Sequence, residues 1–275
     1  MKPNYRNDVI ERALRLPIVG SVARTLRTEF GAPRLTDFDS PSVDAVPDGE
    51  FAQFFVEHDG REINKWVHYF SIYDQLLGDL RSGVPEPDGT YRPLRFLEIG
   101  VSYGGSLEIW RKYFGNDAVI VGVDIDPRCA DPTRPDLDIR IGSQTDGDFL
   151  RRVIADMGGV DVVLDDGSHV AGHQRASFDV LFPLLSERGL YIAEDLHTSY
   201  WLRHGGGYRR RGTFIEVAKS LVDGMHAWYF RVPVPRRSRV AQSEISSVQF
   251  FDSVVAIRKE RKGRPQVMQR GTPMF

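Results

Sequence analysis

Two pairs of consecutive acidic residues carry the strongest chemical signal in the sequence. Asp165 and Asp166 follow the apolar run VDVVL, and Glu194 and Asp195 follow LYIA. If both runs are neighbouring parallel strands, up to four carboxylates point toward one crevice, where like charges repel unless a cation lies among them. Oxygen ligands without cysteine favour a hard divalent ion, with Mg²⁺ ahead of Mn²⁺ and Ca²⁺. One residue of each pair has the alternative of capping a helix or holding a cofactor.

A histidine accompanies each acidic pair. His169 lies three residues after Asp166, on the same loop or the first helical turn. A histidine beside a divalent ion is suited to take the proton of a hydroxyl whose pKa the ion lowers. His173, one helical turn further, and His197, after the second pair, are alternative ligands or second bases. A single histidine of this kind is more often structural, but the convergence of these groups at strand ends favours His169 as the general base.

The stretch FLEIGVSYGGSLEIW contains two overlapping motifs that imply different chemistries. One is G-x-S-x-G around Ser102, the nucleophile elbow of serine hydrolases, and the other is a glycine-rich turn, opening at Gly100, that suits a nucleotide. A hydrolase needs an acid and a histidine on separate loops. Here the acids at 165–166 share one loop with His169, so the nucleotide turn is favoured and Ser102 is a small polar residue within it.

The spacing from this turn to the next strand also fits a dinucleotide-binding domain. Asp124 follows Gly100 by about the distance expected of an acid that contacts a ribose. The G-x-G-x-x-G motif is nevertheless broken, because Ser102 occupies its second glycine position. A nucleotide-binding oxidoreductase that uses NAD stays open as an alternative.

Repeated strand and helix patterns must position these groups. From residue 94, short apolar runs alternate with helical segments, which predicts a mainly parallel sheet with helices on both faces and ligands at the carboxyl ends of its strands. Two further strands, SSVQFF and SVVAIRKE, follow the helix TFIEVAKSLVDGM. The other predicted strands are LRFLEIG, AVIVGVDID, LDIRIG, VDVVLDDG and LYIAEDL, and the helices are GSLEIWRKYF, TDGDFLRRVIADM and AGHQRASFDVLFPLLSERG.

The N-terminal part is different in character. Residues 7–30 have apolar residues at helical spacing, and 31–50 form a polar, proline-rich linker or covering loop. We predict a helical and loop extension over residues 1–60 and one catalytic domain over 61–275. Within the domain, INKWVHYFSIYDQLLGDLRSG predicts a helix whose aromatic residues are mostly core, with one or two lining a site.

Composition limits the class of partner. The 275 residues carry a formal net charge of −2, so no global field attracts nucleic acid or anionic membrane. No apolar run is long enough to span a bilayer, and the N-terminus lacks a signal-peptide pattern. The single cysteine, Cys129, fits a reducing compartment. We expect a cytoplasmic protein without a nucleic-acid partner.

The pattern LEIGVSYGGS followed by VIVGVDID resembles the first two strands of class I S-adenosylmethionine (SAM)-dependent methyltransferases. That resemblance implies a Rossmann-like fold with a seven-stranded, mostly parallel sheet, and a glycine turn next to the methionine moiety. It implies Asp124 as the ribose ligand, with Asp126 as second choice, while GSQTD matches the adenine region, where helix capping is the alternative. The implied cofactor set is Glu98, Gly100, Gly104, Ser106, Asp124, Asp126, Gln144, Asp146 and Asp165.

The D-x-x-H spacing of Asp166 and His169, followed by the Glu194–Asp195 pair and LHTSYW, resembles a narrower group. These are the metal-dependent sugar O-methyltransferases of macrolides and other glycosylated natural products, including the mycinamicin, macrocin and rhamnosyl enzymes. The resemblance covers roughly residues 62–258. It implies Mg²⁺ held by Asp166, Glu194 and Asp195 with two sugar hydroxyls, His169 as base, and a homo-oligomer.

The sequence therefore predicts methylation of a sugar hydroxyl in a glycosylated metabolite, glycolipid or oligosaccharide. A metal-dependent O-methyltransferase for a catechol-like acceptor shares the same carboxylates, and a non-catalytic binding module shares the same fold. The later stretch LRHGGGYRRRGT is either a lid on the acceptor side or an exposed loop.

Overall fold

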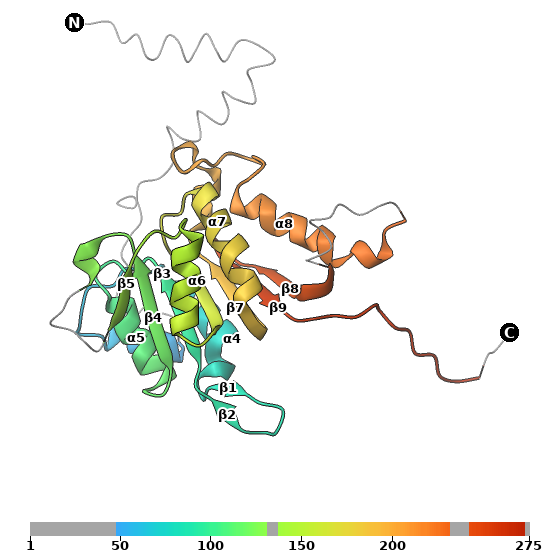
Figure 1. Ribbon diagram of the computed structural model, residues 1–275, viewed down its shortest axis with the longest axis horizontal. Coiled ribbons are helices and arrows are strands. Elements are labelled where there is room, and N and C mark those ends of the chain that lie inside the picture. Colours follow the sequence, from blue (N-terminus) through green and yellow to red (C-terminus); the bar gives the residue numbers. More distant parts are fainter. Residues whose placement is uncertain (1–47, 131–136, 232–241, 273–275) are drawn as a thin grey trace, which may run out of the picture.

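A seven-stranded sheet forms the centre of the protein (Figure 1). The computed structural model describes residues 48–130, 137–231 and 242–272. The strands lie in the order β5-β4-β3-β6-β7-β9-β8; β5, β4, β3, β6 and β7 are parallel, and β9 is antiparallel to both β7 and β8. The mostly parallel α/β fold predicted from the sequence is confirmed. The strands are β3 (Arg95–Ile99), β4 (Val119–Asp124), β5 (Asp138–Ile141), β6 (Val160–Asp165), β7 (Leu185–Ala193), β8 (Ile245–Phe250) and β9 (Val255–Lys259).

Helices cover both faces of the sheet and enclose two apolar cores. One core contains residues of α3 (Glu50–Val56), α4 (Tyr69–Leu77) and α5 (Gly105–Phe114). The other contains residues of α6 (Gly147–Asp156), α7 (Ala171–Leu181) and α8 (Phe214–Met225). The helix predicted over 171–189 ends early, because Pro183 cannot continue it. Short elements are β1 (Val84–Pro85), β2 (Tyr91–Arg92) and 3₁₀ turns at Gly78–Leu80, Pro127–Cys129, Phe182–Leu184, Leu196–Tyr200, Leu202–His204 and Ala227–Tyr229.

Helix α3 belongs to the folded body, although it precedes the predicted domain boundary at residue 60. Phe51 is fully buried, with its ring centroid 4.8 Å from that of Trp110 and 4.6 Å from that of Tyr73. Such aromatic contacts add stability beyond the burial of area. The helices predicted within residues 7–30, and nearly all of the linker, lie outside the described residues.

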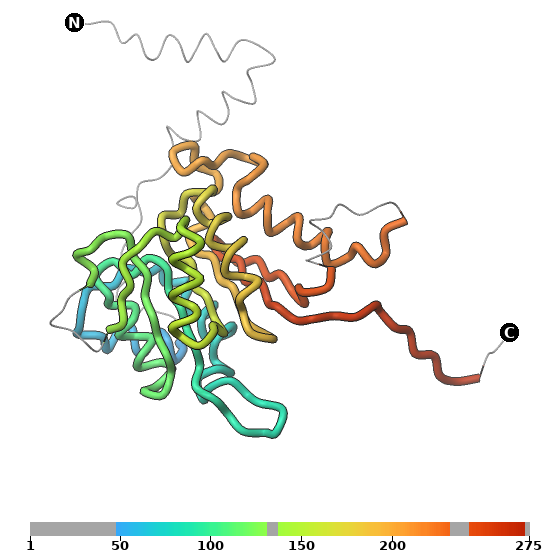
Figure 2. Tube along the Cα trace, viewed as in Figure 1, coloured from blue at the N-terminus to red at the C-terminus, as the bar shows by residue number. Residues whose placement is uncertain are grey.

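The chain after β9 leaves the sheet and runs away from the body (Figure 2). Residues 263–272 are exposed throughout this stretch. Among the described residues, no helix combines the length and hydropathy that a membrane-spanning segment needs.

The parallel strands bring the sequence-predicted site residues to one edge. Gly100 donates its N–H to the carbonyl of Val123 at 2.7 Å, and Asp166 donates to the carbonyl of Ile99 at 2.9 Å. Glu194 continues this ladder by donating to the carbonyl of Asp165 at 3.0 Å. The turns that follow β3, β4, β6 and β7 are therefore neighbours at the carboxyl ends of the strands, where α/β sheets bind ligands.

At the opposite end of the sheet, Asp161 holds two arginines. Arg92 donates to both carboxylate oxygens at 2.7 Å, Arg95 donates its backbone N–H at 2.9 Å, and Ser186 donates its hydroxyl at 2.5 Å. Burial alone would raise the pKa of Asp161, but these hydrogen bonds outweigh it and hold the pKa well below its ordinary value. Asp161 is thus an ionised anchor of β6.

We expect Asp161→Asn to lower the free energy of unfolding by about 2–3 kcal/mol at neutral pH, because both arginines lose the Asp161 carboxylate and Arg92 keeps only its ion pair with Glu86. The folded-state pKa of Asp161 is depressed, so this stability is present above the unfolded-state pKa of about 4 and is lost as pH falls through the folded pKa. Urea unfolding of both proteins at neutral pH and below about pH 4 measures the difference, which should shrink in acid. Equal stability at neutral pH would show that the cluster contributes nothing net.

Candidate active site

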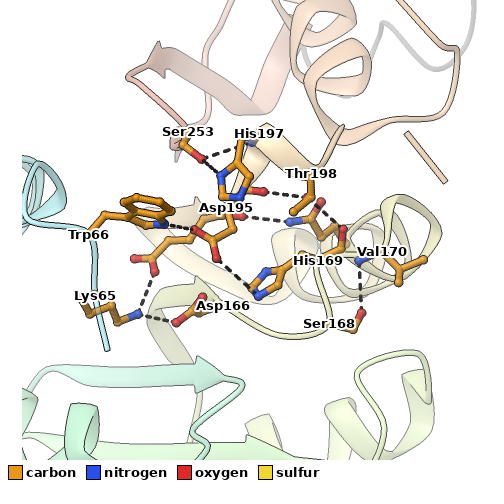
Figure 3. A network of polar contacts seen from close by, with 12 residues as sticks. Lys65, Trp66, Asp166, Ser168, His169, Val170, Asp195, His197, Thr198 and Ser253 are labelled. Carbon is orange, nitrogen blue, oxygen red and sulfur yellow. Dashed lines mark hydrogen bonds and ion pairs between the residues drawn. The ribbon is translucent and has the colours of Figure 1, made fainter. Parts of the chain in front are cut away.

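Three of the sequence-predicted residues form a compact group at the end of β6 and β7 (Figure 3). One ligand atom from each of Asp166, His169 and Asp195 lies within 4.8 Å of the others, which suits a metal ion. The Nε2 atom of His169 is 3.5 Å from Oδ2 of Asp195. Its Nδ1 atom is buried and has no hydrogen-bond partner among the described residues. Nε2 is therefore the nitrogen of His169 that faces the group.

The backbone is strained at two of these three residues. His169 and Asp195 both have left-handed backbone angles, with φ of 56° and 53°. Residues other than glycine adopt this region only at a cost, and such strain gathers at functional sites. Thr198 ties the two turns together, because its hydroxyl donates to the carbonyls of His169 at 3.1 Å and Asp195 at 2.7 Å.

A buried lysine lies among the acids. The side chain of Lys65 is 4% exposed, and its ammonium donates to Asp166 at 2.5 Å and to Glu194 at 2.8 Å, with Glu98 3.7 Å away (Figure 3). Burial alone would lower the pKa of Lys65, but the charges of Asp166 and Glu194 outweigh it and raise the pKa well above the ordinary value. Lys65 is thus a charged counter-ion of the cluster.

The acids have strongly perturbed protonation. Burial raises the pKa of Glu98, Asp166 and Glu194 to about 7 each, although the Lys65 ammonium pulls each of them down. Carboxyl groups in such an environment need a cation to stay ionised at neutral pH. Within the described part of the chain, the Lys65 ammonium is the cation that contacts Asp166 and Glu194. A divalent ion bound here would favour the ionised forms of these acids further.

The segment at the start of α4 holds the second acidic pair. Asp195 accepts from the indole N–H of Trp66 at 3.2 Å and from the hydroxyl of Tyr69 at 2.8 Å. Tyr73 donates to Glu194 at 2.5 Å. One or two aromatics of this segment were predicted to line a site, and three of them contact the acidic pair. The prediction of a helix from residue 63 is wrong at its start, since α4 begins only at Tyr69. The non-helical chain before it lets Lys65 reach the acids.

Two cavities meet at the glycine turn after β3. Each has a volume of about 230 Å³ and includes Gly100 in its wall. The first is lined by Ile99, Asp124, Ile125, Gln144, Ser168 and His173, among others. The second is lined by Glu62, Asn64, Lys65, Ser102, Ser106 and Asp166, among others. Because Asp166 forms part of the second wall, a ligand along the glycine turn reaches the acidic group.

The predicted cofactor residues differ in how they meet these cavities. Asp124 closes the glycine turn, because its Oδ2 accepts from the N–H groups of Val101 at 3.0 Å and Ser102 at 3.1 Å. Asp126 borders a neighbouring cavity of about 790 Å³, where hydrogen bonds from Arg128 lower its pKa to about 2. Gly104 is the N-cap residue of α5 and has a φ of 87°, which favours glycine.

Two other predicted residues support the walls from behind, and one of them contacts Ser106 on the wall of the second cavity. Glu98 and Asp165 are fully buried; Glu98 accepts from Ser106 at 2.7 Å, and Asp165 accepts from Ser177 and Tyr191. Burial also raises the pKa of Asp165.

The GSQTD segment divides between the wall and a helix end. Gln144 donates to Asp165 at 3.1 Å and accepts from the N–H of Ser168 at 2.8 Å, so it links two turns. Asp146 caps α6 by accepting from the N–H groups of residues 148 and 149. Helix capping, the alternative weighed for this segment, is thus what Asp146 does.

The other two histidines lie outside the compact group. His173 lines the first cavity, and its Nδ1 is 2.8 Å from the hydroxyl of Ser168. His197 has its Nδ1 2.7 Å from the hydroxyl of Ser253, and burial lowers its pKa. Trp201 packs against His197 with ring centroids 4.8 Å apart.

Comparisons with known proteins agree with this geometry. No family model matches the chain. A tetracenomycin rhamnosyl 3'-O-methyltransferase of Streptomyces olivaceus is 33% identical over 224 residues, which cover 78% of this chain and 54% of that protein. Mycinamicin VI 2''-O-methyltransferase of Micromonospora griseorubida is 32% identical over 71% of this chain and 49% of its own length. The chain thus spans about half the length of these relatives.

A solved structure has the same fold. A methyltransferase of the mycinamycin biosynthetic pathway, in complex with Mg, S-adenosylhomocysteine (SAH) and mycinamycin VI, has a TM-score of 0.64 and 29% identity over 78% of this chain and 55% of its own. The protein has the Rossmann-like fold of class I SAM-dependent methyltransferases. Within that class it is homologous to the sugar O-methyltransferases of glycosylated natural products, as its motifs predicted.

Proposed function

We propose that the protein is a SAM- and Mg²⁺-dependent O-methyltransferase that methylates a sugar hydroxyl of a glycosylated natural product, glycolipid or oligosaccharide. The observation that carries the proposal is the compact group of Asp166, His169 and Asp195, which opens beside the cavities at the glycine turn. The relatives named above are enzymes of this kind, and the related structure contains Mg and SAH.

The residues fit a divalent ion and a cofactor. Asp166, Glu194 and Asp195 would hold the ion, since their oxygens are hard donors. When bound, the ion supplies Lewis acidity that lowers the pKa of an alcohol. Asp124 and Gln144, on the wall of one cavity, would bind the nucleoside, and Ser106, on the wall of the other, would contact the methionine part.

His169 would remove the proton of the acceptor hydroxyl. Its Nε2 faces Asp195, and Thr198 and the strained backbone keep the ring in place. Nε2 of His169 would accept the proton of the acceptor hydroxyl as that oxygen is methylated by SAM, which would supply an activated methyl group when bound. The protein thereby contributes positioning and proton transfer, each of which accelerates such a displacement.

The proposal also includes the cellular location, assembly and domain bounds of the enzyme. We place it in the cytoplasm without a nucleic-acid partner, in keeping with its near-neutral charge and single cysteine. We further propose a homo-oligomer, and a catalytic domain over residues 61–275 against which α3 packs through Phe51.

Thermal unfolding with different ligands tests the function. SAH should raise the midpoint, NAD⁺ should not, and Mg²⁺ should add to the shift relative to a chelator, because a ligand that binds only the folded state stabilises it. At about one hundred times its Kd, SAH should contribute about 2.7 kcal/mol. Stabilisation by NAD⁺ alone would reject the methyltransferase assignment. Stabilisation by SAH justifies a screen of sugar acceptors against aromatic diols.

A further inference from the structure

Lys65 occupies the place where a metal would meet two of its proposed ligands. Its ammonium contacts Asp166 and Glu194 at 2.5 and 2.8 Å, and its side chain is almost completely buried. Among the described residues, the side chains that lie close enough together to hold one metal ion are those of Asp166, His169 and Asp195, and Glu194 does not belong to this group. Glu194 is absent from that group while its two oxygens accept from Lys65 and Tyr73.

Asp166 belongs to both arrangements. Its carboxylate is part of the metal-compatible group, and its Oδ2 accepts the shortest hydrogen bond of Lys65. A divalent ion bound by Asp166 would therefore lie close to the positive ammonium of Lys65. Two cations this close in a poorly hydrated site repel each other strongly. The ion and the ammonium therefore compete for the carboxylates of Asp166 and Glu194.

We propose that Lys65 is a built-in counter-ion that competes with the divalent metal for Asp166 and Glu194 and so sets the metal affinity of the site. The inference rests on the metal site of the proposed function. Without metal, the ammonium keeps the acidic turns after β6 and β7 together. When metal binds, the ammonium withdraws toward the adjoining cavity of about 230 Å³, whose wall includes Lys65, Glu62 and Asn64.

Calorimetric titration of the full chain with MgCl₂ alone tests this competition. We would use about pH 8, above the pKa of about 7 of the cluster acids, and compare wild type with Lys65→Met and Lys65→Gln. Both variants remove the charge, and Lys65→Gln can still donate hydrogen bonds to the acids if the methionine variant fails to fold. Lys65→Arg keeps the charge. Lys219→Met removes the same charge from an exposed pair with Glu216 on α8 and is the matched control.

We expect the neutral variants to bind Mg²⁺ with a Kd at least about tenfold lower than that of wild type. Lys65→Arg should not bind more tightly than wild type, and Lys219→Met should leave the Kd unchanged. The metal-free neutral variants should also melt at a lower temperature and gain more from Mg²⁺, because their buried acids lack a counter-ion. A lysine that only packs would lower the melting temperature without tightening Mg²⁺ binding.

The outcomes separate this inference from the function on which it rests. If wild type binds Mg²⁺ and the neutral variants bind it equally or more weakly, Lys65 does not compete and the inference is wrong, while the metal site stands. If neither wild type nor the variants bind Mg²⁺, the metal site of the proposed function is rejected and the inference with it.

Discussion

His169→Asn should reduce turnover by about 10²- to 10⁴-fold, the usual contribution of a positioned general base. Asparagine is the suitable replacement because His169 has a φ of 56°, a left-handed conformation that asparagine tolerates better than alanine does. The backbone of the loop, and with it Asp166, should therefore keep its place. The loss should appear in kcat at saturating SAM and Mg²⁺, measured with an acceptor found in the sugar screen.

The binding of SAH and Mg²⁺ should change little in this variant, because the second cavity and the carboxylates are intact. His173→Gln is the matched control: His173 lies one helical turn further and lines the first cavity. We expect it to weaken SAH binding while kcat at saturation stays near that of wild type. Near-normal turnover in His169→Asn would refute the base assignment, and a collapse of kcat in His173→Gln would transfer the role to His173.

The mainly parallel sheet and the edge that holds the site could be predicted from the sequence. Apolar runs that each end on glycine or acid alternate with helical segments, and parallel strands place all of these ends at one edge. The strands that end at Asp165–Asp166 and at Glu194–Asp195 were interpreted as neighbours, and the pairing of β6 with β7 confirms this interpretation. The prediction needed only local patterns and topology.

The individual partners within that edge could not be predicted in the same way. Lys65 lies 101 residues before Asp166 and 129 before Glu194, and no local pattern reports such a contact. A signal was nevertheless present. Lys65, Tyr69 and Tyr73 recur at intervals of four in a largely apolar segment, and a lysine on a buried stripe needs an acidic partner.

Local sequence patterns also could not predict which residue of the Asp165–Asp166 pair faces the site and which is structural. Asp165 and Asp166 are consecutive, so alternation along β6 sends their side chains to opposite sides. Asp165 turns into the core, to Ser177 and Tyr191, whereas Asp166 faces Lys65 and the open group. Asp165 is the structural residue because α7 covers it, and the position of that helix depends on the whole fold.

Gly100→Ala should destabilise the protein by about 3 kcal/mol or more and weaken the binding of both SAH and Mg²⁺. Gly100 has a φ of 86°, and a Cβ built there would lie 2.2 Å from the carbonyl oxygen of Asp166 and 2.7 Å from Cα of Gly167. Both neighbours are backbone, which cannot move aside as a side chain can. The glycine turn and the acidic loop would have to separate, and overpacking of this kind costs on the order of 1–3 kcal/mol in addition to the strain.

Gly115→Ala is a control that introduces left-handed backbone strain without a steric clash. Gly115 has a φ of 79°, close to that of Gly100, but a Cβ there would meet no atom within 4 Å. We expect this control to cost about 1–2 kcal/mol, from left-handed strain alone, and to leave both ligands bound normally. Urea unfolding and calorimetric titration of the two variants measure the difference. If the two variants lose the same stability and ligand affinity, the contact between the glycine turn and the acidic loop is dispensable. If Gly100→Ala loses more stability and binds both SAH and Mg²⁺ more weakly, this contact couples the cofactor turn to the acidic loop.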